Sequence, residues 1–255
     1  MSRYDVAMDD SLTLKIFDDA SALATAAAQT IASIASEAVS ARGRFTVALS
    51  GGGTPRETYM RLAQPPYGET VPWPQTFVFF SDERCVRHDH PESNYRMAQE
   101  TLLAKVPIPA SQIFPILCEH GAESDAAAAG YARALSEVFG LRRGELPRFD
   151  LILLGVGIDG HTGSLFPGSP ALKEVFRPVV AVHAAAAAIP ERITLTYPVL
   201  NNAAHVIFLA AGAEKTKVVR SALKEGVLLP AGMVRPANGR LVWMLDRAAA
   251  ALLGP

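Results

Sequence analysis

Short apolar runs alternate along the chain with longer segments in which apolar residues recur every three or four positions. The helical spacing is clear over residues 20–41, where one stripe is apolar: Leu23, Ala27, Ile31, Ile34 and Ala38. Gly43 predicts the end of this helix, and residues 45–49 follow as a strand. Alternation of a strand with a crossover helix is typical of an α/β protein with a mostly parallel sheet.

The same patterns predict the remaining elements. We expect strands at 76–80, 113–117, 149–154, 178–182, 192–196, 205–210 and 240–245. We expect helices at 55–63, 93–104, 123–139, 213–224 and 246–253, and a loop over the alanine run at 184–188. No repeat or linker divides the sequence. It therefore predicts one α/β domain over residues 1–255, with a mostly parallel, Rossmann-like sheet flanked by helices.

Composition narrows the class of partner. The chain has 255 residues, of which 49% are hydrophobic and 19% charged, with a formal net charge of −1. The apolar fraction is ample for a core and excludes a largely disordered chain. The charge gives no electrostatic reason to expect nucleic acid or an anionic membrane surface, and no apolar stretch is long enough for a membrane helix. An anionic ligand would have to be held by a few placed groups. Nothing in the sequence indicates an oligomer.

The cysteines and the N-terminal segment bear on location. Two cysteines, Cys85 and Cys118, cannot form a disulfide scaffold, so a reducing compartment is expected. The segment from Met1 to Lys15 starts polar and carries Asp5, Asp9 and Asp10, unlike the basic-then-apolar order of a signal peptide. These features predict a cytoplasmic protein.

Glycines follow the strand at 45–49, in the segment Gly51, Gly52, Gly53 and Thr54. In parallel α/β sheets, ligands bind beyond the carboxyl ends of the strands. Glycines let backbone N–H groups approach a ligand closely, and the start of the next helix favours an anion. A tight turn would need only one glycine, whereas three predict a phosphate-binding loop. It is not a P-loop, because the Gly-Lys-Ser/Thr ending is absent.

Charged residues follow the strand at 76–80. Asp82, Glu83 and Arg84 could orient a substrate hydroxyl and stabilise developing charge, or could simply pair with one another. Two further cations, Arg192 at the start of a strand and Lys215 at the start of a helix, could complete an anion site. Taken alone, each of these cations would be an ordinary surface charge.

A glycine-lined loop follows the apolar strand at 149–154. Gly155, Gly157 and Gly160 spell the G-x-G-x-x-G pattern of dinucleotide sites, but prolines and a glycine follow too soon for the helix that the fingerprint should open. The loop instead presents Asp159 and His161 together. A histidine can accept a proton from water near neutral pH, and a neighbouring carboxylate can orient it. We therefore predict an acid–base pair here.

Two other patterns are set aside. The run 85–90 contains cysteine, histidine and aspartate, but no second pair at zinc spacing follows it. No serine lies in a G-x-S-x-G elbow, so water rather than serine should be the nucleophile.

These motifs together resemble those of the 6-phosphogluconolactonase family over nearly the whole chain. The matching blocks are Leu49-Ser50-Gly51-Gly52-Gly53-Thr54-Pro55, Ser81-Asp82-Glu83-Arg84, Glu92-Ser93-Asn94-Tyr95, the stretch from Leu154 to Gly168, Arg192-Ile193-Thr194-Leu195-Thr196 and Gly212-Ala213-Glu214-Lys215. Glucosamine-6-phosphate deaminases share the glycine loop and the Asp-Gly-His loop, which implies a related fold. They usually have tyrosine where Arg84 stands, and Asn-Glu-Pro where this chain continues with 164–168. Gly163 is one departure, since the lactonases commonly have alanine there.

The resemblance implies hydrolysis of 6-phospho-D-glucono-1,5-lactone in the oxidative pentose phosphate pathway, with no metal and no organic cofactor. It implies that His161 is the general base, with Asp159 and Asp82 orienting it or the substrate. It further implies that Arg84 stabilises the tetrahedral intermediate, and that the phosphate is bound by the remaining site residues, Gly51, Gly52, Gly53, Thr54, Arg192 and Lys215. Two alternatives remain: an aminosugar-phosphate deaminase or isomerase, and a sugar-phosphate sensor without catalysis.

Overall fold

The computed structural model describes residues 4–7, 12–119 and 123–254, with only the backbone described for 4–7. Asp9 and Asp10 of the N-terminal segment lie outside the described residues. Within these ranges, no helix combines the length and the hydropathy that crossing a membrane requires.

The main sheet has seven strands in the order β1-β2-β10-β9-β6-β3-β4. Their bounds are β1 (Tyr4–Ala7), β2 (Leu12–Phe17), β3 (Phe45–Leu49), β4 (Thr76–Phe80), β6 (Leu151–Leu154), β9 (His205–Ala210) and β10 (Arg240–Asp246). Only β1, at the edge, pairs antiparallel with its neighbour, and all other pairs are parallel. The predicted mostly parallel α/β sheet is confirmed. Strands β1 and β2 were not predicted.

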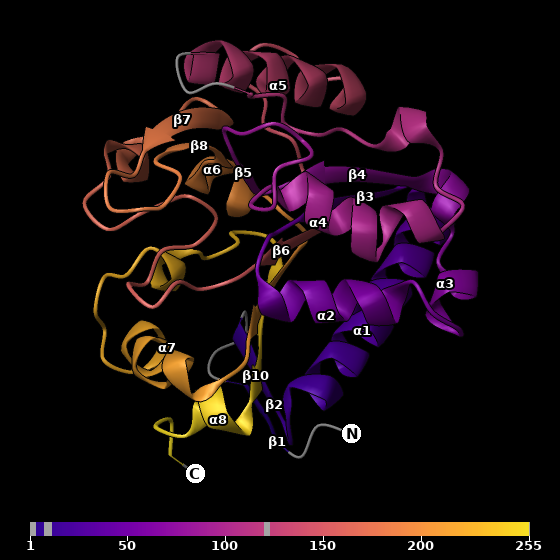
Figure 1. Cartoon of the computed structure of the whole chain (residues 1–255). Helices are drawn as coiled ribbons and strands as arrows, with labels where there is room; N and C mark the ends of the chain where they lie inside the picture. Colours follow the sequence, from indigo (N-terminus) through magenta and orange to yellow (C-terminus); the bar gives the residue numbers. More distant parts are fainter. Residues whose placement is uncertain (1–3, 8–11, 120–122, 255) are drawn as a thin grey trace.

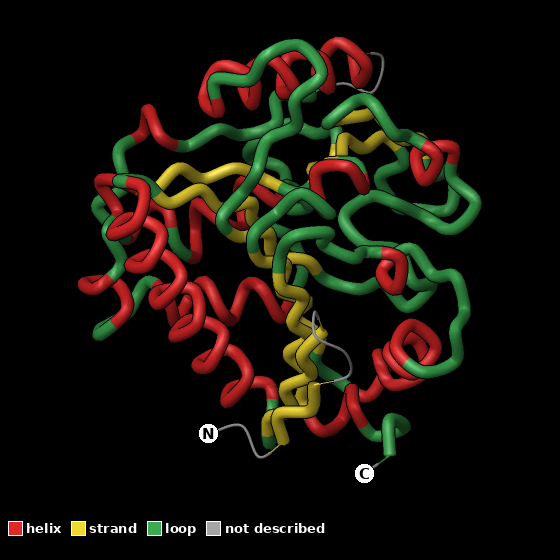
Figure 2. The backbone as a smooth tube through the Cα atoms, turned by 180° about the vertical axis from the view of Figure 1, so that it is seen from behind, coloured by secondary structure: helices red, strands yellow, loops and turns green. Residues whose placement is uncertain are grey.

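Helices cover both faces of this sheet. On one side lie α1 (Ala20–Arg42), α2 (Gly53–Leu62), α3 (Tyr67–Thr70) and α4 (Asn94–Thr101), and on the other α7 (Thr216–Leu223), as Figure 1 shows. Figure 2 shows the strands of this main sheet as one twisted band between the helices. Helix α1 begins where the side chain of Asp19 accepts a hydrogen bond from Ala22 N, and it ends at Gly43, whose φ of 72° is left-handed.

A second, antiparallel sheet lies beyond the carboxyl end of β4. It has three strands in the order β5 (Asp82–Arg84), β8 (Glu191–Leu195) and β7 (Val179–His183), and α5 (Ser124–Phe139) packs against β7 (Figure 1). The predicted strands at 178–182 and 192–196 thus exist, but they form a sheet of their own. The charged segment after β4, for which no strand was predicted, is itself a strand.

Three predicted elements differ from the structure. The strand at 113–117 is wrong: only Ile113 bridges Val78, and Pro115 has no N–H with which to continue a ladder. The helix at 246–253 shrinks to α8 (Arg247–Ala250). Residues 213–224 divide into a short 3₁₀ turn and α7.

The two cysteines lie together. Cys85, directly after β5, forms a disulfide with Cys118, and both are buried. Sequence spacing could not reveal this pairing, because 33 positions separate the two residues. Because the two cysteines are paired, they no longer indicate a reducing compartment.

Candidate active site

A pocket of about 320 Å³ opens where the loops after β3 and β6 leave the sheet. In the main sheet β3 and β6 are neighbours. The next strand of this sheet after β3 is β4, on one side of the pair, and the next after β6 is β9, on the other side. The loops after β3 and β6 therefore diverge at this point. Of the predicted site residues, Asp159 does not line the pocket; those that line it are Gly51, Gly52, Gly53, Thr54, Asp82, Arg84, His161, Arg192 and Lys215.

The glycine loop presents backbone N–H groups to this pocket. Gly52 has a φ of 109°, which a residue with a Cβ rarely adopts, and α2 starts at the next residue. The first N–H groups of a helix have no partners inside the helix, so those of Gly53 and Thr54 are suited to an anion. Helix α2 starts two residues before the predicted position 55, so Pro55 is its third residue and lies in the first turn.

A buried tyrosine fixes the start of the glycine loop. Tyr59 lies in α2. Its hydroxyl donates to Ser50 O at 2.9 Å and accepts from Ser50 N at 3.0 Å. Burial raises the pKa of Tyr59, so the hydroxyl keeps the proton that it donates. Both backbone groups of Ser50 are thereby satisfied.

Strand β5 carries Asp82 into the pocket wall. Its Oδ2 accepts a hydrogen bond from Ser164 Oγ at 2.7 Å, and the amide of Asn94 donates to its Oδ1 at 3.3 Å and its backbone O at 2.9 Å. Asp82 and Ser164 are both buried. The aspartate is therefore held in one orientation by residues from two distant segments.

Glu83 points away from the pocket and anchors β5 to α4. Its carboxylate accepts hydrogen bonds from four groups: the backbone N–H of Arg84, Asn94 and Tyr95, and the hydroxyl of Ser93. Burial raises the pKa of Glu83, and the backbone donors oppose this shift. Glu83 thus has a structural role at the start of α4, and Asp82 and Arg84 on either side of it face the pocket.

Two arginines lie side by side across the second sheet. Arg84 of β5 is directly opposite Arg192 of β8 in the antiparallel register. Nη1 of Arg84 donates to the backbone O of Glu92 at 2.6 Å, and Nε of Arg192 donates to Ile189 O at 2.7 Å. Burial, and next the charge of Arg84, lower the pKa of Arg192. Two adjacent cations in a half-enclosed site attract an anion or a developing negative charge.

The loop after β6 holds the acid–base pair. Gly157 N bonds to His161 O at 2.8 Å, which closes the loop tightly, and Nδ1 of His161 lies 2.5 Å from Oδ1 of Asp159. A Cβ on Gly157 would overlap with the His161 ring. Phe166 packs against the ring at 4.4 Å between centroids and also lies under the Arg192 guanidinium. The loop does not open a helix, as the prolines and glycine that follow it predicted.

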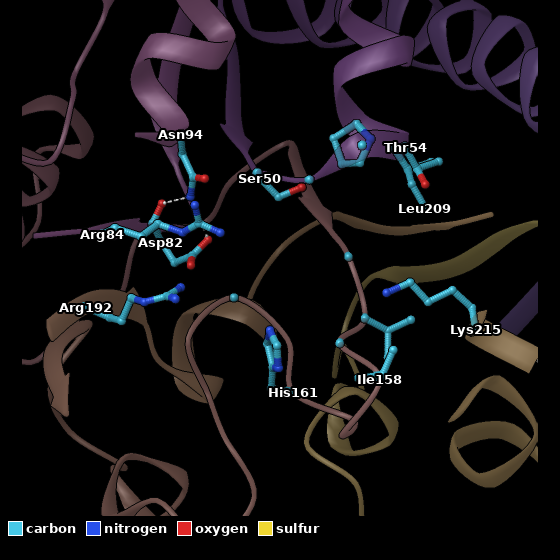
Figure 3. A pocket seen from close by; sticks show the side chains of 18 residues that line it. Ser50, Thr54, Asp82, Arg84, Asn94, Ile158, His161, Arg192, Leu209 and Lys215 are labelled. Carbon is cyan, nitrogen blue, oxygen red and sulfur yellow. Dashed lines mark hydrogen bonds between the residues drawn. The ribbon is translucent and has the colours of Figure 1, made fainter. Parts of the chain in front are cut away.

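Lys215 enters the pocket from a different side. It ends the 3₁₀ turn 213–215 that precedes α7, and Figure 3 shows it on the side of Thr54, with Arg192 beside Arg84 across the pocket. The sequence analysis assigned Arg192 and Lys215 to one phosphate, and Figure 3 shows the two side chains pointing into the pocket from opposite sides.

The run 85–90 gathers no metal ligands. Cys85 is in the disulfide, and the part of the chain that the structure describes contains no group of three or more His, Cys, Asp or Glu side chains that could hold a metal ion.

Comparison with known proteins places the chain. The family model described as glucosamine-6-phosphate isomerases/6-phosphogluconolactonase matches residues 18–243. The chain belongs to this family. A probable 6-phosphogluconolactonase 3, chloroplastic, from Oryza sativa subsp. indica is 41% identical over 255 residues, covering 94% of this chain and 76% of that protein.

Solved structures of the family have the same fold. A 6-phosphogluconolactonase from Trypanosoma brucei matches with a TM-score of 0.82 at 31% identity, over 94% of this chain and 98% of that chain. A monomeric glucosamine-6-phosphate deaminase matches with a TM-score of 0.75 at 21% identity, over 95% of this chain and 99% of that chain, which shows a shared fold. Some of the family members are named as chloroplastic, so a cytoplasmic location stays a prediction.

Sequence reasoning missed several residues of this 6-phosphogluconolactonase-type pocket. Ser50, Asn94 and Gly163 line it, and Ser164 and Phe166 position its charged groups. All five lie in blocks that carry the family resemblance, but their residue types alone signal no chemistry.

Proposed function

We propose that this protein hydrolyses 6-phospho-D-glucono-1,5-lactone to 6-phospho-D-gluconate, a step of the oxidative pentose phosphate pathway. Membership of the family and relatives named 6-phosphogluconolactonase support this activity. The observation that carries the proposal is a histidine–aspartate pair at one pocket that also receives two arginines, a lysine and the start of a helix. That combination suits attack by water on a carbonyl in an anionic substrate.

His161 is the general base in this proposal. Because Asp159 engages Nδ1, the other ring nitrogen, Nε2, is left to accept a proton from water. The water oxygen bonds to the lactone carbonyl carbon and forms a tetrahedral intermediate. The bond from that carbon to the ring oxygen then breaks, and the proton held by His161 passes to the ring oxygen. No covalent enzyme intermediate is required.

The charged groups on β5 stabilise this reaction. Arg84 faces the pocket with its Nη1 fixed by Glu92, so its charge is already placed when the oxyanion develops. Asp82, held by Ser164 and Asn94, orients the substrate. A fixed carboxylate can accept a hydrogen bond from a substrate hydroxyl at no further cost of ordering.

The phosphate binds at the glycine loop. The N–H groups of residues 51–54 and the positive end of α2 favour a dianion, with Lys215 on the same side of the pocket. Arg192 points into the pocket from the opposite side and is the second counter-charge of this proposal. A phosphate or sulfate ion in a crystal structure, contacting these amides, Arg192 and Lys215, would support the whole assignment. We propose that residues 1–255 form one catalytic domain, because segments spread from Ser50 to Lys215 line a single pocket.

A direct assay separates this activity from the alternatives. Purified protein is given the phosphorylated lactone, with the spontaneous hydrolysis rate subtracted, and glucosamine 6-phosphate, with ammonia measured. We expect lactone hydrolysis that falls to the spontaneous rate in His161→Ala. Ammonia release without lactone hydrolysis would identify a deaminase, and binding of phosphosugars without turnover would identify a sensor.

A further inference from the structure

One buried hydroxyl in the pocket wall has no hydrogen-bond partner among the described residues. Ser50 is 4% exposed and lines the pocket, and its Oγ makes no hydrogen bond to any residue that the structure describes. Its backbone N and O are both satisfied by Tyr59, so only the side chain is left over. Burying a hydroxyl without a partner destabilises the folded protein. A buried polar group that lines a pocket and lacks a hydrogen-bond partner is a candidate for ligand recognition.

The amide of Asn94 lies on the same wall. Both atoms of Asp82 that it approaches are acceptors, so Nδ2 must face Asp82 and Oδ1 must face the opposite way. Oδ1 thus lies against Gly51, where any Cβ would overlap with it. Figure 3 shows this oxygen turned towards Ser50, with His161 on the far side of the pocket.

A third polar group belongs to another residue that lines the pocket, Arg84. Nε of Arg84 is buried and also has no hydrogen-bond partner among the described residues, whereas Nη1 is held by Glu92. Ser50 directly follows β3, Arg84 ends β5 and Asn94 begins α4. Each retains hydrogen-bonding capacity in the wall between the glycine loop and the second sheet.

We propose that Ser50 Oγ, with Asn94 Oδ1, recognises the hydroxyl groups at C3 and C4 of the sugar lactone. This inference rests on the proposed function. The phosphate on C6 lies at the glycine loop and the carbonyl carbon C1 lies at His161, so the carbons between them face the Ser50 wall. A serine hydroxyl both donates and accepts, and the amide oxygen accepts, which matches the two neighbouring hydroxyls of a sugar. Ser50 is then a specificity residue, and not part of the proton transfer.

Ser50→Ala tests the proposal, because Asn94 also holds Asp82 and its substitution would disturb two groups. The substrates are the parent lactone and its 2-deoxy, 3-deoxy and 4-deoxy analogues, each generated from the corresponding deoxyglucose 6-phosphate. We expect Ser50→Ala to lower kcat/KM for the parent roughly 5- to 100-fold. The loss should persist on the 2-deoxy lactone and vanish on the 3-deoxy or the 4-deoxy lactone. Ser33→Ala, on α1 outside the pocket, is the matched control.

Stability provides an independent readout. Because Ser50 Oγ has no partner in the part of the chain that the structure describes, Ser50→Ala should melt at the same temperature as wild type or higher. A lower melting temperature with equal losses on all four lactones would mean a structural role and overturn the proposal. Equal activity on the parent, or a loss that vanishes only on the 2-deoxy lactone, would also overturn it. Failure of wild type to hydrolyse the parent would instead overturn the proposed function.

Discussion

Oδ1 of Asp159 lies 2.5 Å from Nδ1 of His161, on a loop that is closed by a hydrogen bond from Gly157 N to His161 O. A carboxylate accepts only, so the neutral imidazole must carry its proton on Nδ1. The acceptor lone pair is then on Nε2. This contact fixes the tautomer that a general base needs. The pair and the glycine that closes its loop, Gly157, lie within five consecutive positions.

Asp159→Asn should weaken the base without removing it. An amide can present its N–H₂ to Nδ1 and select the wrong tautomer, so we expect kcat to fall at least about 10-fold, and His161→Ala to lose roughly 10²–10⁴-fold. The measurement is steady-state lactone hydrolysis. His183 is a matched control: it makes the same 2.5 Å contact with Glu191, yet it does not line the pocket. A similar loss in His183→Ala would contradict the assignment.

Gly157→Ala should damage the same pair sterically. A Cβ there would overlap with the His161 ring and come within 2.6 Å of Oδ1 of Asp159. One of the two side chains must move, and we expect kcat to fall 10-fold or more while KM changes little. Gly130→Ala, in α5 far from the pocket, has room for the methyl group and serves as the control. Full activity in Gly157→Ala would show that the observed pair is not required.

Arg192 and Lys215 should differ if they serve different ends of the substrate. Lys215→Met should raise KM for the phosphorylated lactone about 10- to 100-fold and leave hydrolysis of unphosphorylated glucono-1,5-lactone unchanged. The same result for Arg192→Met would support a shared phosphate site. Slower hydrolysis of both lactones in Arg192→Met would remove Arg192 from the phosphate and assign it, with Arg84, to the carbonyl.

The disulfide should contribute to stability. Cys85 and Cys118 close a loop across 33 positions, for which chain entropy predicts about 4 kcal/mol. We expect Cys118→Ala, or wild type in excess dithiothreitol, to melt at a lower temperature, and reductant to have no further effect on the variant. Thermal unfolding followed by circular dichroism measures this. Two free thiols in the unreduced native protein, found by titration, would contradict the pairing.

Glu174 should make stability depend on pH in acid. Backbone N–H groups of Arg177 and Phe176 lower the pKa of Glu174 to about 2. Because the pKa is lowered in the folded protein, the ionised Glu174 carboxylate stabilises the fold above the ordinary carboxyl pKa, near 4.5. This stabilisation is lost as pH falls towards 2. Glu174→Gln should therefore have a lower free energy of unfolding than wild type at pH 7. The difference between the two proteins should shrink below pH 4.5. Urea unfolding at pH 7, 5 and 3.5 tests this, and a difference independent of pH would refute it.

The parallel α/β core is predictable from the sequence, because strand and helix periodicities are local and burial on both faces leaves continuous apolar runs such as 151–154. It also placed the glycine loop and the Asp159–His161 pair, since both are short motifs directly after strands. The charged residues of 82–84 were found, but their strand was not, because three polar residues show no apolar alternation.

Tertiary structure alone decided the rest. The register that sets Arg84 opposite Arg192, the bond from Ser164 to Asp82 and the Cys85–Cys118 disulfide join residues that are 33 to 108 positions apart. No local pattern encodes such pairs, because the chain brings them together only when separate elements pack. The unpartnered hydroxyl of Ser50 is of the same kind: its burial and its lack of a partner are properties of the folded wall, not of the sequence around it.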